Sequence, residues 1–272
     1  MKRDTSFYYS FLVLPPRKRS AIVAVWDFCR AVDDAVDEAT GDNAAKELAL
    51  WRSELRACYA GAGVTPGTGQ GRALKPYVEE FGLPREPFEQ LIEGVAMDLD
   101  HDSYPTFEAL AEYCRRVASS VGLICLDIFG ARDPRSRSYA INLGMALQLT
   151  NIIRDVAGDL ERGRVYLPAE DLARFGVSHA DLAAGKVTTA VRGLLEFECE
   201  RAHDYYRRAA ADLPRSDTRS LVAAEIMAGI YFEILRRIER SGYDVFSRRI
   251  RVPRPRRAVI ALRTWARTLL AP

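Results

Sequence analysis

The chain carries Asp33-Asp-Ala-Val-Asp37 and, about 120 residues later, Asp155-Val-Ala-Gly-Asp159. In both stretches two aspartates stand four residues apart, so on a helix both carboxylates project from one face. Like charges at this spacing destabilise an isolated helix by roughly 0.2–0.5 kcal/mol. Two such pairs on apolar-rich helices therefore predict a cation between the carboxylates.

Magnesium is the cation that suits these pairs. Mg²⁺ binds through one or two carboxylates and completes its octahedron with water and substrate phosphate oxygens, so two facing pairs would hold a diphosphate. Taken alone, either pair is better explained as a solvated helix face. The residues around the second pair are mostly apolar, however, which indicates partial burial, and buried carboxylates need partners.

The fold class follows from periodicity. Apolar residues recur at helical spacing almost everywhere, and no stretch alternates with period two between turn signals. We predict an all-α chain with a first helix from Pro16 to about Thr40 and further helices over residues 43–60, 72–81, 85–99, 107–129, 135–160, 187–212, 217–241 and 256–270. Residues 163–168 form an extended connector. No linker or repeat divides the chain, so we expect one domain over residues 1–272.

Composition narrows the function classes. The chain is 48% hydrophobic and 28% charged, which is typical of a globular protein. No run of 18 apolar residues and no signal peptide is evident, so we expect a cytoplasmic location. Five cysteines without Cys-x-x-Cys spacing give no disulfide framework or zinc ribbon. Three scattered histidines and no Gly-x-Ser-x-Gly argue against a histidine-centred hydrolase.

Arginines accompany the acidic stretches at Arg30, Arg154, Arg164 and Arg248. A guanidinium binds phosphate with two parallel hydrogen bonds. Arg154 is also well explained as an ion pair with Asp155, and Arg164 as a plain surface residue. The numerous aromatic residues are mostly core, yet their faces would also stabilise a positive charge in an apolar pocket.

The C-terminus is strongly basic, because the last 26 residues hold eight arginines and no acidic residue. Within the helix predicted at about 256–270, an apolar stripe contains Val259, Leu262, Trp265 and Leu269. Two structural explanations of this segment are that it docks as the last helix of the domain or that its charges keep the protein soluble. A functional explanation is that it forms an interfacial membrane helix. Nucleic-acid binding is not expected, because the rest of the chain is acidic overall and shows no nucleic-acid fold signature.

Together these motifs resemble the squalene and phytoene synthases, which are head-to-head prenyl transferases, over essentially the full length. The resemblance rests on Ser6-Phe-Tyr-Tyr-Ser-Phe11, Cys29-Arg-Ala-Val-Asp-Asp-Ala-Val-Asp37, Tyr113-Cys-Arg-Arg-Val-Ala118, Gln148-Leu-Thr-Asn-Ile-Ile-Arg-Asp155 and Gly163-Arg-Val-Tyr-Leu-Pro168. It implies an isoprenoid-synthase helical bundle around a central cavity. Met97-Asp-Leu-Asp100 and the ending from Gly242 to Trp265 look most like bacterial presqualene diphosphate synthases of hopanoid pathways.

The resemblance also implies roles for individual residues. Two or three Mg²⁺ ions bridging two farnesyl diphosphates would be held by Asp33, Asp37, Asn151, Asp155 and Asp159. The diphosphates would lie near Arg30, Asn151, Arg154, Arg164 and Arg248. The reacting ends would lie near Tyr113, Tyr166 and Tyr231, and the prenyl channel would be lined by Phe7, Val117, Ala118, Gly122 and Gln148.

The implied activity is Mg²⁺-dependent condensation of two farnesyl diphosphates to presqualene diphosphate and free diphosphate, without NADPH, in squalene and hopanoid biosynthesis. The alternatives are a phytoene or dehydrosqualene synthase of carotenoid biosynthesis and a full NADPH-dependent squalene synthase. A non-enzymatic alternative is an inactive helical membrane-surface scaffold. As partners we expect the inner face of the membrane, through the C-terminal helix, and the next enzyme in squalene formation.

Overall fold

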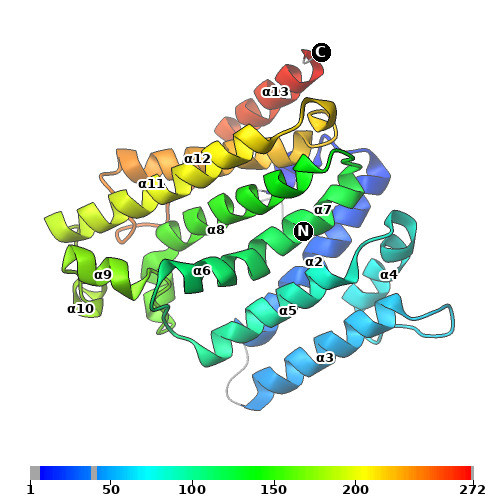
Figure 1. Ribbon diagram of the computed structural model, residues 1–272, viewed down its shortest axis with the longest axis horizontal. Coiled ribbons are helices and arrows are strands. Elements are labelled where there is room, and N and C mark those ends of the chain that lie inside the picture. The colour runs from blue at the N-terminus through cyan, green and yellow to red at the C-terminus, as the bar shows by residue number, and fades with distance from the viewer. Residues whose placement is uncertain (1–6, 38–41, 271–272) are drawn as a thin grey trace.

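The computed structural model describes residues 7–37 and 42–270, without the side chains of residues 7, 8, 37 and 42. Helices make up about three quarters of the chain, and in its described part the β-structure is a single isolated bridge between Ser103 and Val165. The predicted all-α class is therefore confirmed. In Figure 1 the helices form a layered bundle, with α8 running through the middle.

The helices that build the bundle have the following bounds. They are α1 (Phe7–Phe11), α2 (Pro16–Asp37), α3 (Asp42–Tyr59), α4 (Gly69–Phe81), α5 (Arg85–Asp100), α6 (Phe107–Cys114), the π-helix η1 (Arg115–Ser119), α7 (Ser120–Phe129), α8 (Arg135–Glu161), α9 (Ala169–Phe175), α10 (His179–Ala183), α11 (Thr189–Asp212), the 3₁₀-helix η2 (Arg215–Asp217), α12 (Val222–Arg240) and α13 (Arg254–Leu270).

Most predicted helices appear close to their expected bounds, but three expectations were wrong in detail. The short helices α1, α9 and α10 were not predicted, because five to seven residues give too little periodicity. Helix α4 begins at Gly69 rather than 72, because Thr68 caps it by accepting a hydrogen bond from the Gly71 backbone. Helix α12 begins at Val222 rather than 217, because the Asp217 carboxylate instead accepts bonds from the Arg132 and Asp133 amides before α8 and from the Ser136 hydroxyl in its first turn.

Helix α8 is the central element of the bundle. It packs against α11, α7, η1 and α12, and Figure 1 shows α11 and α12 on one side of it and α6 and α5 on the other. Its buried residues include Leu149, Ile152, Ile153 and Val156. Because the acidic residues of its last two turns alternate with these apolar ones, α8 presents a polar face beside a buried face.

The predicted helix over residues 107–129 is interrupted by the π-turn η1. Two glycines on neighbouring helices lie against this turn. A Cβ on Gly94 of α5 would stand 2.6 Å from the Arg116 Cβ, and one on Gly144 of α8 would stand 2.6 Å from the Ser119 Cα. The turn therefore fits between two helices that approach closely because they have no side chain there, a tertiary cause that helical periodicity does not show.

Residues 163–168 are the extended connector that the sequence predicts. The Val165 and Ala169 amides donate to the Asp102 and Tyr104 carbonyls, both at 2.8 Å, so the connector is held against the loop before α6. Val165 and Leu167 are buried. Tyr166 between them is thereby directed toward α5 and α6, where the candidate site lies.

Candidate active site

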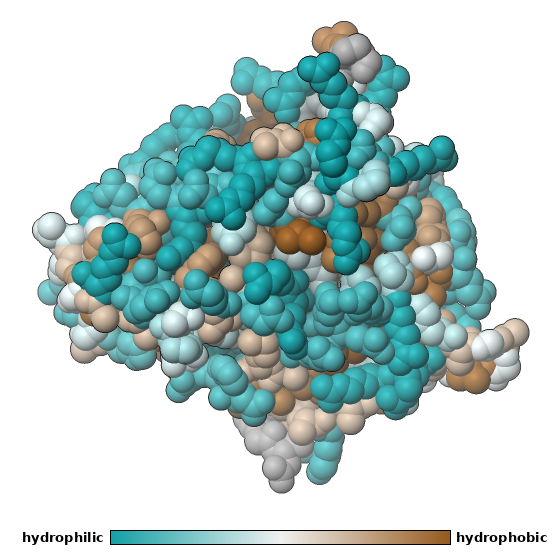
Figure 2. Space-filling model, in the orientation of Figure 1, coloured by the Kyte–Doolittle hydropathy of each residue, from teal (hydrophilic) through white to brown (hydrophobic). Residues whose placement is uncertain are grey.

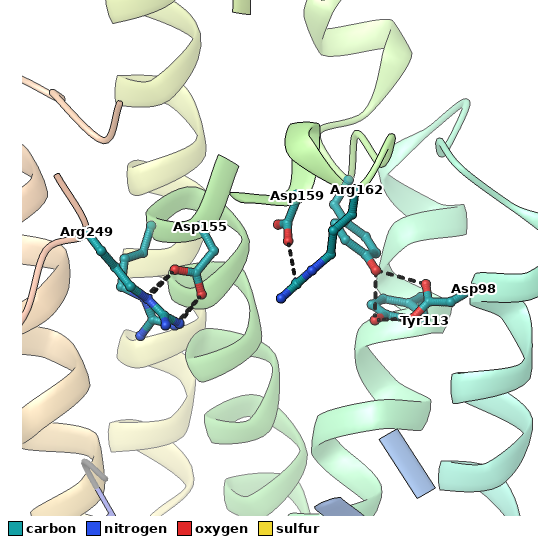
Figure 3. A network of polar contacts seen from close by, with 8 residues as sticks. Asp98, Tyr113, Asp155, Asp159, Arg162 and Arg249 are labelled. Carbon is teal, nitrogen blue, oxygen red and sulfur yellow. Dashed lines mark hydrogen bonds and ion pairs between the residues drawn. The ribbon is translucent and has the colours of Figure 1, made fainter. Parts of the chain in front are cut away.

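The second acidic pair lies on the last two turns of α8, with both carboxylates half-buried. Asp155 is enclosed by two guanidinium groups. Arg154 contacts both of its carboxylate oxygens, the Nε to Oδ1 distance being 2.9 Å. Arg249 donates to the same two oxygens from the opposite segment, with two parallel bonds of 2.9 Å. Figure 3 shows Asp155 facing Arg249 across this ion pair.

Arg249 reaches Asp155 because its segment is fixed on both sides. The stretch between α12 and α13 is not helical, and Val245, Ile250 and Val252 are buried in the core. These anchors direct the exposed guanidinium back to α8. Arg249 was not among the predicted residues. The predicted Arg248 lies near Asp244, whose pKa is lowered first by hydrogen bonds from Ser247 and more weakly by the Arg248 charge. The contact of Arg248 with a diphosphate stays a prediction.

The charge balance at Asp155 favours its ionised form. Burial raises the pKa of this carboxyl, but hydrogen bonds and charge from Arg154 and Arg249 outweigh burial and lower it. The ion pair of Arg154 with Asp155, the alternative to a phosphate contact, is thus present, and the diphosphate contact of Arg154 stays a prediction. Arg154 is 11% exposed at its side chain, and it also lies beside the Tyr231 hydroxyl of α12. Burial raises the pKa of Tyr231 although Arg154 opposes that shift, so this tyrosine is a neutral hydroxyl.

Asn151 stands one turn before Asp155 on the same face. Its Nδ2 donates to the Gln148 Oε1 at 3.3 Å, and it lies beside the Tyr231 hydroxyl. Its Oδ1 is buried without a hydrogen-bond partner. An unsatisfied buried carbonyl oxygen is costly unless something binds it, so this atom fits a cation ligand.

Asp159, one turn after Asp155, is 15% exposed at its side chain, and Arg162 Nη1 stands 3.8 Å from its carboxylate. Its backbone carbonyl accepts a bond of 2.9 Å from the Arg164 amide, which closes the end of α8. Asp159, Arg164 and Tyr166 line one small cavity. In Figure 3 Asp159 stands between the Asp155 ion pair and a group of tyrosines.

The tyrosines of this group surround Asp98 of α5, and two of them donate hydrogen bonds to its carboxylate. The Tyr166 hydroxyl donates to one carboxylate oxygen at 2.9 Å, and the Tyr113 hydroxyl donates to the other at 3.1 Å. The rings of Tyr113 and Tyr166 stack with centroids 5.2 Å apart, and Tyr104 stacks on Tyr166 at 6.0 Å. The structure therefore brings together Tyr113 and Tyr166, and adds Asp98 and Tyr104; their place beside the reacting ends of a substrate stays a prediction.

Burial keeps these tyrosines protonated. It raises the pKa of Tyr104, Tyr113 and Tyr166, and the Asp98 charge raises each of them further. The hydroxyls of Tyr113 and Tyr166 are therefore donors with a fixed acceptor, whereas the Tyr104 hydroxyl is buried without a partner. Three stacked aromatic faces beside an acidic helix end can stabilise a nearby positive charge. Asp98 lies in the Met97-Asp-Leu-Asp100 stretch, but its spacing alone gave no sign of this partnership.

The first acidic stretch lies on α2. Asp33 is half-buried near the end of this helix, while the Asp37 side chain lies outside the described residues. Arg30 is exposed and pairs with Asp34 at 3.0 Å. The metal-binding roles of Asp33 and Asp37, and the diphosphate contact of Arg30, stay predictions.

The predicted channel residues lie on several elements. Val117 and Ala118 are half-buried in η1, and Gln148 is half-buried on α8. Gly122 of α7 faces the Ala140 carbonyl, where an added Cβ would stand 3.0 Å from the oxygen, so it permits close packing of α7 on α8. The Phe7 side chain lies outside the described residues. A cavity of about 420 Å³ opens elsewhere, between α8, α11, α12 and α13, and none of the predicted channel residues whose side chains are described lines it.

The donor atoms suit magnesium better than a softer metal. Carboxylate and amide oxygens are the ligands that Mg²⁺ prefers, and the unpartnered Asn151 Oδ1 belongs to that set. Within the part of the chain that the structure describes, no three acidic, histidine or cysteine side chains form a ready metal cluster. The oxygen donors on this face of α8 therefore fit a magnesium ion whose remaining ligands would be water or substrate oxygens.

Comparison with known proteins identifies the class to which this fold and site belong. The model of the squalene/phytoene synthase family matches residues 1–258. The chain belongs to this family of prenyl transferases, as the sequence motifs predict.

Individual relatives agree with this assignment. The chain is 39% identical over 264 residues to a 15-cis-phytoene synthase of Synechococcus elongatus, covering 91% of this chain and 84% of the relative. It is 37% identical over 283 residues to a phytoene synthase of Arthrospira platensis, covering 98% and 87%.

Solved structures show the same fold. A dehydrosqualene synthase superimposes with a TM-score of 0.86 at 31% identity, covering 97% of this chain and 92% of that one. The squalene synthase HpnC of Alicyclobacillus acidocaldarius superimposes with a TM-score of 0.76 at 35% identity, covering 88% and 89%. The predicted isoprenoid-synthase architecture is thus confirmed.

Proposed function

We propose that this prenyl transferase condenses two geranylgeranyl diphosphates head to head, as a phytoene synthase. The support is the similarity to two phytoene synthases over most of both chains. The observation that carries a diphosphate reaction is the polar end of α8, where Asp155, Asp159 and arginines adjoin a stack of tyrosines. The expected presqualene diphosphate synthase activity becomes the second candidate.

Magnesium would be held by Asp33, Asp37, Asp155 and Asp159, with Asn151 as a further oxygen donor. When bound, it would neutralise charge on the leaving diphosphate. The protein's own contribution is a set of guanidinium groups at the same place. Arg154 and Arg249 would position diphosphate oxygens, because a charge-assisted bidentate contact fixes both distance and orientation.

The first half of the proposed chemistry breaks one carbon–oxygen bond and one carbon–hydrogen bond and forms two carbon–carbon bonds. The C1–O bond of one substrate breaks with its electron pair leaving on the diphosphate. The C2–C3 double bond of the second substrate attacks the allylic cation at C1, and loss of one proton closes a cyclopropane. We assign the proton to the released diphosphate, because the tyrosines at the site are neutral donors. Their stacked faces would stabilise the cation, and the helical bundle would exclude water.

In a phytoene synthase this cyclopropylcarbinyl diphosphate, whose diphosphate sits on the carbon beside the ring, reacts further. Its second diphosphate leaves, the ring opens, and a second proton is lost, so two substrates yield one hydrocarbon and two diphosphates. No electron is added in this sequence, and NADPH is therefore not required. A squalene synthase of the complete type differs at this step, because it needs a hydride.

The second candidate uses the shorter farnesyl tail and is favoured by one specific observation. The superimposed structures are a dehydrosqualene synthase and a squalene synthase. The two substrates differ by five carbons, or about 4 kcal/mol of tail burial at ~0.8 kcal/mol per carbon. Channel depth, rather than the acidic helices, would therefore select between them.

Product analysis tests the proposal. The purified chain is incubated with Mg²⁺ and either geranylgeranyl or farnesyl diphosphate, with and without NADPH. We expect a C40 hydrocarbon from the C20 substrate with NADPH making no difference. Accumulation of presqualene diphosphate from the C15 substrate, with the C20 substrate untouched, would replace phytoene synthesis by the second candidate. A folded protein that consumes neither substrate would contradict both.

A further inference from the structure

Helix α13 is amphipathic in the reverse sense of a normal surface helix. Its buried positions include Arg257, Thr264 and Thr268, which are 4–8% exposed. Its exposed positions include Leu262 at 63% and Trp265 at 41%. A helix that docks only onto its own domain would bury its apolar face instead.

The exposed apolar residues form one continuous face. Val259, Leu262, Trp265 and Leu269 recur at intervals of three and four, so they line one side of the helix. Leu270 extends the series at 85% exposure. Figure 1 shows α13 at the outer edge of the bundle, and Figure 2 shows hydrophobic surface where this helix ends.

The side of α13 that faces the bundle makes specific contacts but leaves a cavity beside them. Gly229 of α12 allows Ile260 to approach, since a Cβ there would stand 2.9 Å from its Cγ2, and Arg257 Nε donates to the Val252 carbonyl at 2.7 Å. The cavity of about 420 Å³ lies beside these contacts and is lined by Ile260, Arg263, Thr264 and Arg267. Packing against the bundle therefore leaves Val259, Leu262, Trp265 and Leu269 between 39% and 63% exposed.

A row of arginines flanks that face. Arg256, Arg263 and Arg267 are spaced by seven and four residues, so they share one side of the helix. Arg256 and Arg267 lie 3.6 Å from Glu233 and Glu225, yet their side chains remain 44% and 74% exposed. No acidic residue occurs from Ser247 to the end of the chain. The flank is thus positive and accessible.

We propose that the exposed face of α13 docks on an anionic lipid bilayer surface, with Leu262, Trp265 and Leu269 in the headgroup boundary and the arginines on lipid phosphates. An exposed apolar face bordered by arginines is the pattern of an interfacial helix. A second copy of the chain is a poorer occupant, because face-to-face contact would bring two acid-free, arginine-rich segments together. In the described part of the chain no helix is long and apolar enough to cross a membrane, so the contact is peripheral.

Vesicle co-sedimentation of the full chain tests this proposal independently of catalysis. The vesicles contain phosphatidylcholine alone or with phosphatidylglycerol. We expect binding to the anionic vesicles that weakens with salt. The double variant Leu262→Gln with Trp265→Gln should lower the partition coefficient by about tenfold or more, the loss expected for two large apolar groups. Leu50→Gln on α3, where Leu50 is also 44% exposed, should change nothing.

A second pair of variants tests whether the arginines of α13 are required for binding to anionic vesicles. Arg263→Gln should weaken anionic binding by about fivefold, the share of one basic residue near such a surface, whereas Arg52→Gln on α3 should not. Equal binding to neutral and anionic vesicles, or wild-type binding by the Leu262/Trp265 variant, would overturn the proposal. So would a dimer in analytical ultracentrifugation that this double variant dissolves, because it would assign the face to a second copy. Circular dichroism confirms that each variant is folded.

Discussion

Arg249 and Asp155 are 94 residues apart in sequence, and two parallel hydrogen bonds of 2.9 Å join them. Arg154 contacts the same carboxylate from its own helix. Asp155 thus binds two guanidinium groups, one from Arg154 on α8 and one from Arg249 in the segment after α12. Under the proposed function, these groups stand where a diphosphate would meet the acidic end of α8.

Replacement of Arg249 tests that placement. Arg249→Ala should lower kcat/KM for the prenyl diphosphate by about 10- to 100-fold, since a hydrogen bond to a charged group contributes about 1.5–3 kcal/mol. Arg249→Lys keeps the charge but loses the paired geometry, so it should recover only part of the activity. Steady-state kinetics measures both. Arg251→Ala, a nearby exposed position, is the control, and an equal loss there would contradict a specific role for Arg249.

Asp98 should act as a positioning residue, because its carboxylate accepts hydrogen bonds from the Tyr113 and Tyr166 hydroxyls. Asp98→Asn weakens both acceptors and should lower kcat more than it raises KM, with a loss of about 1–3 kcal/mol in stability. Asp100→Asn, on the same helix but exposed, should have neither effect. Kinetics and thermal unfolding measure the two quantities. If kcat of Asp98→Asn matches the parent while its melting temperature falls, the residue is only structural.

The two glycines of α8 give a matched pair for packing around η1. Gly144→Ala places a Cβ 2.6 Å from the Ser119 backbone, and we expect a loss of about 1–3 kcal/mol from overpacking. Gly158→Ala on the same helix meets no atom within 4 Å, and it should stabilise the protein by up to about 1 kcal/mol. Urea unfolding measures both variants. Equal effects at the two positions would contradict the close approach of α8 to η1.

A pH dependence should come from the buried Glu198. Its burial raises the pKa of the carboxyl to about 7, although Arg201 opposes this shift. The folded state therefore holds a proton that the unfolded state releases near pH 4.5. Stability should fall as pH rises from about 4.5 to 7, by at most about 1.4 kcal/mol per pH unit. Glu198→Gln should flatten this region in denaturant titrations at several pH values. An unchanged slope would exclude Glu198 as its source.

The features that the sequence predicted correctly depend on local patterns, namely helical periodicity, residue spacing and the order of motifs. Periodicity located α2, α5 and α8, and the spacing of Asp155 and Asp159 put both on one face of α8. Motif order then predicted the family, which the comparisons confirm. The phytoene relatives nevertheless favour a different member from the one that Met97-Asp-Leu-Asp100 suggested.

What the sequence missed depends on contacts between distant elements. Arg249 lies in a non-helical segment, where no period distinguishes it from Arg248, and only the burial of Ile250 and Val252 sets its direction. Asp98 belongs to the candidate site because it accepts hydrogen bonds from Tyr113 and Tyr166, which lie on two other elements. The π-helix η1 lies against Gly94 and Gly144 on neighbouring helices, and local propensity does not encode these contacts.

The central claim is that the two acidic stretches form one magnesium-dependent site. The most direct measurement is diphosphate release from geranylgeranyl diphosphate with and without Mg²⁺, for the parent chain and for Asp33→Ala and Asp155→Ala. We predict release that requires Mg²⁺ and falls by at least about 100-fold in each variant, since one essential metal ligand is worth several kcal/mol, while circular dichroism stays unchanged. Undiminished release from both folded variants would contradict the claim.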